Sequence, residues 1–441
     1  MSQSMSADAS AVGREMYEMI RELYPICRSI TGDGVRETLR RVQERIPLAI
    51  REVPSGTQVF DWTVPREWNI RDAYVKNSRG EKIIDFTRSN LHVVSYSVPV
   101  RTTLPLSGLR GHLFSLPERP AWIPFRTSYY TEAWGFCLAH DQLSALGEDE
   151  YEVVIDSSLA PGHLSYGEYL IEGERSEEVL LSCHVCHPSL ANDNLSGIAV
   201  ATALAQRLRA MPLTYSYRFL FIPGTIGSIT WLALNEAIIP RIRHGLVITC
   251  VGDGGKLTYK KSRRGDAEID RAAIHVLKHA GGPYEVTDFV PYGYDERQYC
   301  SPGFNLPVGS LSRSSYGRYP EYHTSADDLA FVRPESLADS LAKYLAILDV
   351  VDNNRTYVSR NPKGEPQLGK RGLYRHLGGQ SGNPEMPLLW VLNLSDGRHT
   401  LLDIAERANV PFASVRQAAD ILVKHDLLER CAGDAGAAAV I

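Results

Sequence analysis

Hydrophobic residues between positions 12 and 45 recur at intervals of three and four, which is the spacing of the buried face of a helix. The segment Thr31-Gly32-Asp33-Gly34 interrupts this pattern with residues that favour turns. The chain is therefore predicted to begin with two helices.

Between positions 53 and 126 the pattern changes to short β-rich runs that are separated by proline and glycine. Two of these runs span Gln58 to Val64 and Asn90 to Tyr96. Because the runs are short and closely spaced, we predict a small antiparallel sheet domain.

Beyond Tyr151, apolar runs typical of strands alternate with helical patterns. The alternation predicts an α/β fold in which helices cover both faces of a largely buried sheet. Ligand chemistry in such folds lies at the carboxyl ends of the strands. The strands are expected near 152–155, 169–171, 179–182, 217–222 and 245–251, and the helices near 198–211 and 229–237.

The end of the chain has a different organisation. Residues 353–382 are rich in Asn, Arg, Pro, Lys and Gly and show no sustained pattern, which predicts a linker. Helical patterns then follow in helix-turn-helix order at 388–392, 401–407 and 412–424, as in a winged helix. The predicted domains are an α/β domain (1–52 and 150–355), an inserted β-rich domain (53–149), a linker (356–383) and a winged-helix domain (384–435).

Length and charge narrow the class of protein. A chain of 441 residues is too long for one ordinary core, so two or three domains are expected. The formal charge is only −5, which gives no overall field that would favour nucleic acid or an anionic membrane.

The sequence also bears on location. Residues 1–13 lack the basic and apolar regions of a signal peptide, and no later run of about 18 apolar residues occurs. The seven cysteines are odd in number and scattered, unlike a disulfide framework. We therefore expect a cytoplasmic protein without a membrane partner.

Donors suited to zinc follow the expected strand at 179–182. His184 and His187 lie at or just beyond its end, and Asp193 follows in a loop that leads into the next helix. Zinc in hydrolases takes N, O or S donors and keeps one position open for water. A lone histidine there is more often structural, but together with Tyr322-His323-Thr324 downstream these residues favour a metal site.

These motifs support a resemblance to a known family. The run from Cys183 to Gly197 and the Tyr322-His323-Thr324 triplet are similar to those of bacterial aminopeptidase-like proteins of the zinc exopeptidase superfamily. Those proteins are often named for polysaccharide biosynthesis and carry an inserted β domain and a C-terminal winged helix. The resemblance implies a zinc-exopeptidase-like mixed sheet flanked by helices. It implies metal ligation by Asp193, His323, one or both of His184 and His187, and Asp253.

The resemblance leaves the early histidine open. Superfamily members have His-x-Asp at the strand end, and His184 fits that frame except that Cys186 replaces the Asp. The other frame places the ligand at His187, before Pro188, and is slightly favoured. Asp253 lies among glycines, where a role in a turn is about as expected as ligation.

One departure from the superfamily bears on activity. Its members carry a Glu-Glu pair after the strand that corresponds to 219–222, and one of these acids takes a proton from metal-bound water. Here Pro223 to Ser228 contains no carboxylate. Either another acid serves, with Asp295, Glu296 and Glu321 as candidates, or hydrolysis has been lost. The same departure removes a ligand of a second metal, so one zinc ion is expected rather than two.

The charge of the winged helix argues against DNA binding. Residues 388–430 contain five basic and six acidic side chains, whereas non-specific DNA affinity depends on contacts to phosphates. Protein contact, dimerisation or the formation of a lid is favoured for this domain. The sequence leaves a homo-oligomer open.

Two functional hypotheses result. The first is a zinc-dependent, aminopeptidase-like hydrolase that acts on an amide-linked small substrate or a peptide N-terminus, in polysaccharide or secondary-metabolite biosynthesis. The alternative is a non-catalytic, metal-containing binding or regulatory protein on a peptidase fold. The sequence favours the hydrolase and leaves catalytic activity open.

Overall fold

The protein is described by a computed structural model that covers residues 2–373 and 385–431. It comprises two compact units, of which the first contains Met1–Ala267 and Pro283–Ala342 and the second Glu268–Gly282 and Lys343–Ile441. Among the described residues, no helix is both long enough and apolar enough to cross a membrane.

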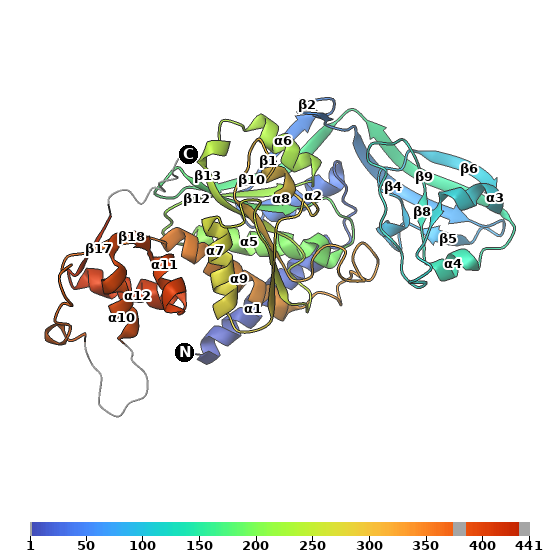
Figure 1. Cartoon of the computed structure of the whole chain (residues 1–441). Coiled ribbons are helices and arrows are strands. Elements are labelled where there is room, and N and C mark those ends of the chain that lie inside the picture. Colours follow the sequence, from blue (N-terminus) through green and yellow to red (C-terminus); the bar gives the residue numbers. More distant parts are fainter. Residues whose placement is uncertain (1, 374–384, 432–441) are drawn as a thin grey trace. The chain divides into compact units, whose positions relative to one another are not determined.

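The first unit is built on an eight-stranded mixed sheet (Figure 1). Strands β12, β11, β13 and β16 are parallel neighbours at its centre, and β1 and β10 add antiparallel pairs at one side. In sheet order the strands are β1 (Ala49–Pro54), β10 (His163–Ile171), β12 (Ser216–Ile222), β11 (Glu178–His184), β13 (Ile242–Ile248), β16 (Val308–Ser312), β14 (Leu257–Lys260) and β15 (Tyr284–Thr287).

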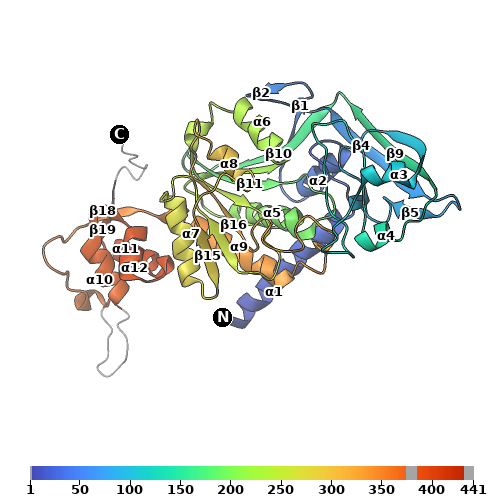
Figure 2. The ribbon, with the colours of Figure 1, turned by 45° about the vertical axis from the view of Figure 1, so that its right-hand side comes forward.

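Burial of the central strands explains their sequence. Every residue of β11 and β12 is buried, because helices α1 (Ser2–Leu23) and α5 (Gly197–Leu208) lie on one face and α6 (Ile226–Leu234) and α8 (Glu296–Tyr299) on the other (Figure 2). Strands that are covered on both faces have continuous apolar runs instead of alternation. The predicted α/β fold class is thus confirmed, as are the two N-terminal helices, α1 and α2 (Asp33–Gln43).

A second sheet lies in the β-rich part of this unit. It has four strands in the order β5 (Lys82–Asp85), β4 (Glu67–Lys76), β9 (Glu150–Ala160) and β6 (Val100–Pro105). The run from Gln58 to Val64 forms the hairpin of β2 (Gln58–Val59) and β3 (Trp62–Thr63).

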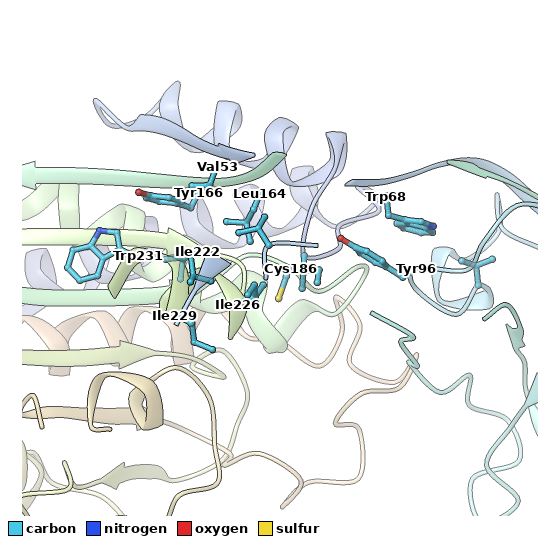
Figure 3. Packing of buried hydrophobic residues seen from close by; sticks show 14 of the residues in the cluster. Val53, Trp68, Tyr96, Leu164, Tyr166, Cys186, Ile222, Ile226, Ile229 and Trp231 are labelled. Atoms are coloured by element: carbon cyan, nitrogen blue, oxygen red, sulfur yellow. The ribbon is translucent and has the colours of Figure 1, made fainter. Parts of the chain in front are cut away.

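The strand predicted over Asn90 to Tyr96 is wrong, because Asn90–His92 form a 3₁₀ turn whose first residue follows the capping hydroxyl of Ser89. Tyr96 beyond it stacks on Trp68, with ring centroids 5.8 Å apart, at the edge of the buried cluster in Figure 3. Packing of this aromatic pair, and not β-propensity, decides the local structure.

The second unit contains the winged helix. Its helices are α10 (Met386–Leu394), α11 (Leu401–Ala408) and α12 (Phe412–Lys424), beside a three-stranded sheet in the order β18 (Asp396–Thr400), β17 (Thr356–Ser359), β19 (Leu428–Arg430). Strand β17 lies within the segment predicted as a linker. Residues 374–384, which include the end of that segment and the first residue of the predicted winged-helix domain, are outside the described residues. The predicted end of this domain, 432–435, is also outside them. Two further helices of the chain are α7 (Glu268–His279) and α9 (Pro334–Asn353).

A buried arginine ties the N-terminal helices to the segment after β11. Arg28 is 1% exposed. Its Nε donates to the carbonyl of His187 at 2.7 Å and its Nη1 to that of Leu23 at 2.6 Å. Guanidinium groups hold their charge when buried only if their donors are satisfied, so these carbonyls fix the turn that contains His187.

Replacement of Arg28 by Met should lower the free energy of unfolding by about 3 kcal/mol, because two carbonyls lose charged donors in a buried site. Urea unfolding followed by circular dichroism measures this. The matched control Arg21→Met removes a surface pair with Glu18 and should cost about 0.5 kcal/mol or less. Equal losses in both variants would contradict the assignment of Arg28 as an internal tie.

Candidate metal centre

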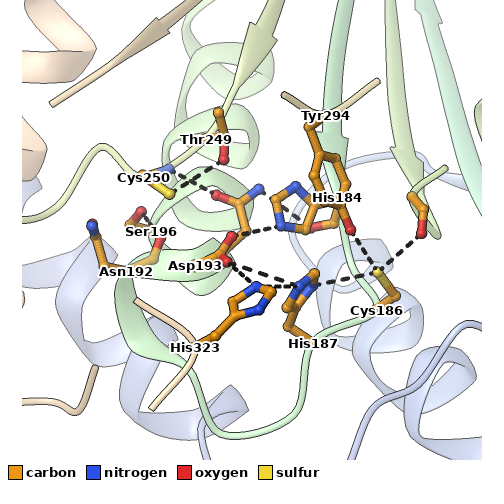
Figure 4. A network of polar contacts seen from close by, with 12 residues as sticks. His184, Cys186, His187, Asn192, Asp193, Ser196, Thr249, Cys250, Tyr294 and His323 are labelled. Carbon is orange, nitrogen blue, oxygen red and sulfur yellow. Dashed lines mark hydrogen bonds and ion pairs between the residues drawn. The ribbon is translucent and has the colours of Figure 1, made fainter. Parts of the chain in front are cut away.

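Three imidazoles converge on one carboxylate at the carboxyl end of the central strands (Figure 4). His184 Nε2 lies 2.8 Å from Asp193 Oδ1. His323 Nε2 and His187 Nε2 lie 3.0 and 3.8 Å from the other oxygen, Oδ2, and 3.2 Å from each other. The structure thus brings together four of the five residues that the sequence predicted as metal ligands. They sit where β11 ends, at the edge expected for ligand chemistry.

The loop that carries Asp193 is fixed by its neighbours in the sequence. Asn192 accepts from the amide of Gly252, and Asn194 donates to the carbonyls of His184 and Ile248. Ser196 accepts from the amide of Val251. These side chains satisfy buried backbone groups at the ends of β11 and β13, which explains why polar residues occur in an otherwise apolar region.

Asp327 holds the same loop from the other side. Its carboxylate accepts from the amides of Asn192 at 2.6 Å and of Asp193 at 2.9 Å. Burial raises the pKa of Asp327 well above its usual range, against the effect of these amides, and the charge of Asp193 adds to the rise. Asp327 therefore positions the loop through its backbone amides.

His323 is held by pairing with the β-rich part of the unit. Its carbonyl accepts from the amide of Phe125 at 2.7 Å, and the Phe125 ring lies 5.2 Å from its ring. The φ angle of His323 is +56°, a left-handed conformation that costs of order 1 kcal/mol in a non-glycine residue. Such a cost is accepted where the surroundings fix the residue, as they do here.

The electrostatics of the cluster centre on a carboxylate that is 0% exposed. Burial acts to raise the pKa of Asp193, but the facing His187, His184 and His323 outweigh it and hold the pKa well below its usual range. Burial lowers the pKa of His187 well below its usual range, so this imidazole is neutral and has a lone pair to offer.

These donors fit zinc. Ligands 2.0–2.1 Å from a tetrahedral zinc ion lie about 3.3 Å from one another. The separations among His187 Nε2, His323 Nε2 and Asp193 Oδ2 are 3.0, 3.2 and 3.8 Å. Asp193 Oδ2 is buried and accepts no hydrogen bond of good geometry, although buried acceptors are nearly always satisfied. An unsatisfied carboxylate oxygen that faces imidazoles is the arrangement that a cation would complete.

The fifth predicted ligand has other partners. Asp253 is 1% exposed, and its carboxylate accepts from the side chain of Asn192, from the amide of Gly255 and from the amide and hydroxyl of Ser314. A carboxylate with four donors is satisfied without a metal. In this structure Asp253 anchors the loop that carries Asp193, through the side chain of Asn192.

The three acids predicted for proton transfer have different surroundings. Asp295 accepts from Ser228 Oγ at 2.8 Å through one oxygen, while the other is buried without a partner. Burial raises the pKa of Asp295 to about 7. Glu296 is paired with Lys260 at 2.8 Å. Glu321 is half-buried, and among the described residues its carboxylate forms no hydrogen bond or ion pair with the cluster.

A tyrosine occupies the space beside Gly224. A Cβ atom on Gly224 would lie 1.9 Å from the Tyr294 ring. That ring lies against His184, with centroids 3.7 Å apart, and its hydroxyl is 3.2 Å from Cys186 Sγ. An aromatic ring from another segment therefore fills the space at the end of β12, where the sequence has no carboxylate.

A cavity of about 360 Å³ opens beside the cluster. His187, His323 and Tyr294 form part of its wall, and Phe125 and Ile226 contribute apolar surface. No carboxylate occurs among the described residues that line it. The cavity has the size of sites that bind small molecules.

Sequence reasoning missed the roles of Tyr294, Arg28 and Asp327. Asp327 lies four residues after His323, but nothing in the sequence indicated its role. Tyr294 has no local pattern, because its position is defined only by the fold.

Substitution of Gly224 by Ala should cost about 2 kcal/mol, because the new methyl group overlaps the Tyr294 ring. In the Tyr294→Ala background the same change should cost about 0.5 kcal/mol or less, since the overlap is gone. A double-mutant cycle of urea midpoints measures the difference. Equal costs in both backgrounds would show that the two residues do not compete for space.

The metal-free protein should lose stability as pH rises from about 4 to 7, because folding favours the protonated form of Asp295. Asp295→Asn has no such proton, so its advantage over the wild type should grow by roughly 3 kcal/mol between pH 5 and pH 8. Urea midpoints at the two pH values measure this, with the exposed Asp61→Asn as control. Parallel pH profiles for all three proteins would refute a raised pKa at Asp295.

Comparison with known proteins extends these observations. The model of a domain of unknown function, DUF4910, matches residues 17–354, and a winged helix-turn-helix model matches residues 355–430. A protein of Clostridium acetobutylicum is 55% identical over 424 residues, which are 96% of this chain and 98% of the relative. Its name is that of a candidate polysaccharide biosynthesis protein with an aminopeptidase-like domain.

Solved structures give the same picture of the fold. A candidate peptidase from Clostridium acetobutylicum aligns with a TM-score of 0.93 at 53% identity, over 97% of this chain and 99% of that one. The zinc aminopeptidase BSAP of Bacillus subtilis aligns with a TM-score of 0.57 at 12% identity, over 77% of this chain and 94% of its own. The latter likeness concerns the fold alone.

The family resemblance inferred from the sequence is thereby confirmed, as is the aminopeptidase-like fold with a C-terminal winged helix. The chain belongs to the DUF4910 family.

Proposed function

We propose that this protein is a zinc-dependent hydrolase that cleaves an amide bond next to a free amino group, in a small molecule or at a peptide N-terminus. The observation that supports this most directly is the convergence of three imidazoles on the buried carboxylate of Asp193, beside a cavity of about 360 Å³. An aminopeptidase-like fold is consistent with this chemistry.

His187, His323 and Asp193 Oδ2 would hold one zinc ion. His184 contacts the other oxygen of the same carboxylate, so it would orient Asp193 without binding the metal itself. The second ring nitrogen of His187, Nδ1, lies 3.4 Å from the thiol of Cys186, which can form a hydrogen bond with it. The corresponding Nδ1 of His184 is buried without a hydrogen-bond partner among the described residues. This difference favours His187 over His184 as the early ligand.

When bound at this site, zinc would polarise the substrate carbonyl and lower the pKa of a coordinated water molecule. The side chain of Tyr294 would donate a hydrogen bond to the carbonyl oxygen. Burial raises the pKa of Tyr294 well above its usual range, so the phenol keeps its proton at neutral pH. Phe125 and Ile226 would exclude bulk water from the reacting groups.

Among the three acids considered, Asp295 suits proton transfer best. A general base works most effectively when its pKa lies near the operating pH, and that of Asp295 is raised by burial to about 7. Glu296 is engaged by Lys260. Because Asp295 is not part of the cavity lining, it would act through an intervening water molecule.

The alternative is a metal-containing binding protein without catalytic activity. It is favoured by one observation, which is that the described lining of the cavity contains no carboxylate. The name of the Clostridium acetobutylicum relative supports a role in polysaccharide biosynthesis for either version.

The winged helix is proposed to contact protein instead of nucleic acid. Two arginines are already paired within the second unit. Arg271 pairs with Asp403 and Glu406, and Arg416 of α12 pairs with Asp349. These two cations are therefore less available for phosphate contacts.

Zinc titration of the chelator-treated protein should give one equivalent per chain. Tight zinc binding should be abolished in His187→Ala, His323→Ala and Asp193→Asn. His184→Ala should weaken it by roughly 10- to 100-fold, because His184 orients Asp193 without binding the metal itself. Half-buried His140→Ala is the control. Failure of the protein to take up zinc, or uptake that none of these changes affects, would refute the metal site.

Hydrolysis is tested separately with a panel of aminoacyl amides, with and without chelator. Release of amine that stops on chelation and returns with zinc is the expected result. Tight zinc binding with no turnover on any member of the panel would favour the binding protein over the hydrolase.

A further inference from the structure

We propose that the cavity beside the metal cluster selects substrates that carry a carboxylate, through Arg297 and Arg126. This inference rests on the proposed function, and it specifies the substrate class of the same site. Two cations of the cavity have no ion-pair partner among the described residues, and no acid occurs in its described lining.

Arg297 is the first of these cations. It lines the cavity from α8, and its Nε is buried without a hydrogen-bond partner. Its guanidinium forms no ion pair with any residue that the structure describes. Leaving a charged donor buried and unsatisfied is costly, so such a group is expected to meet a ligand.

The nearest acid in the sequence does not satisfy Arg297. Asp295, two residues before it, accepts from Ser228, and Arg297 acts on that carboxyl only as a distant charge that lowers its pKa against the larger effect of burial. Glu296, the adjacent residue, is paired with Lys260. The acids around Arg297 are thus turned to other partners.

Arg126 is the second cation in the lining. It is exposed, and its guanidinium lies over the Phe114 ring at 4.1 Å from the centroid, without an ion pair among the described residues. It follows Phe125, which contacts the rings of His187 and His323. The second charge therefore comes from the segment that holds the metal cluster in place.

The rest of the lining favours an anion with a carbon skeleton. No carboxylate in the described lining of the cavity offsets the two positive charges there. Trp62 and Tyr130 are 43% and 54% exposed, and their rings lie 5.4 Å apart in an edge contact at the cavity. Guanidinium groups bind carboxylates through paired donors, and exposed aromatic faces cover apolar parts of a ligand.

Matched substrate pairs test the proposal. One pair, glutamyl and glutaminyl p-nitroanilide, places the carboxylate or its neutral amide in the acyl part of the substrate. The other pair, leucyl-glutamate and leucyl-glutamine, places it in the leaving group. In at least one pair the acidic member should have a kcat/KM about tenfold or more above its neutral partner, as expected for charge-assisted hydrogen bonds. The pair that shows the preference identifies which side of the scissile bond faces the arginines.

Arginine variants then locate the selectivity. Arg297→Met should abolish the preference for the acidic member, and Arg297→Lys should restore only part of it, because lysine keeps the charge without the paired donors. Arg126→Met should reduce the preference less, since its exposed charge is screened by salt. Arg209→Met, which removes an exposed charge from the end of α5, is the control and should leave the preference unchanged.

A binding measurement keeps the test independent of catalysis. By calorimetry, the zinc-loaded protein should bind glutarate about tenfold or more tightly than the neutral isostere glutaramide, and Arg297→Met should remove the difference. Glutarate affinity that survives in Arg297→Met would mean that the metal holds the carboxylate, which overturns the proposal. Circular dichroism confirms that each variant is folded.

The outcomes separate the two proposals. Hydrolysis without a preference in either substrate pair overturns the acidic-substrate inference and leaves the hydrolase intact. Selective binding of glutarate without any hydrolysis supports the inference and contradicts the hydrolase.

Discussion

The carboxylate of Asp193 is a negative charge in a place where water cannot reach it, and much of the surrounding structure serves to make that possible. Three imidazoles face its oxygens, and Asp327 fixes the backbone amides of Asn192 and of Asp193 itself. Because an isolated buried charge is costly, these groups must be kept within narrow positions. Arg28 and Phe125 keep them there from two different parts of the chain.

The sequence predicted this arrangement well where local order and spatial order coincide. His184, His187 and Asp193 lie within ten residues at the end of one buried strand, so the strand pattern alone placed them at one edge of the sheet. The fold class followed from the alternation of strands and helices, and the family from motifs. His323 could be predicted only from its resemblance to a motif, because it lies 130 positions after Asp193 in the chain.

Other features depend on tertiary contacts and leave no local pattern. Asn90 to Tyr96 has the composition of a strand, yet the 3₁₀ turn after Ser89 and the stacking of Tyr96 on Trp68 determine its conformation. The family resemblance implied Asp253 as a ligand, but Ser314, 61 residues later, supplies donors that help to satisfy it. Tyr294 reaches the site only because the chain returns to the end of β12 from a distant segment.

The contact between Gly224 and Tyr294 couples two distant parts of the chain. A glutamate side chain would not fit at position 224 while the tyrosine ring fills that space, and loss of the ring alone would leave a void beside His184. The two positions therefore cannot be changed independently. A variant designed to place an acid at the end of β12 would have to change both of them.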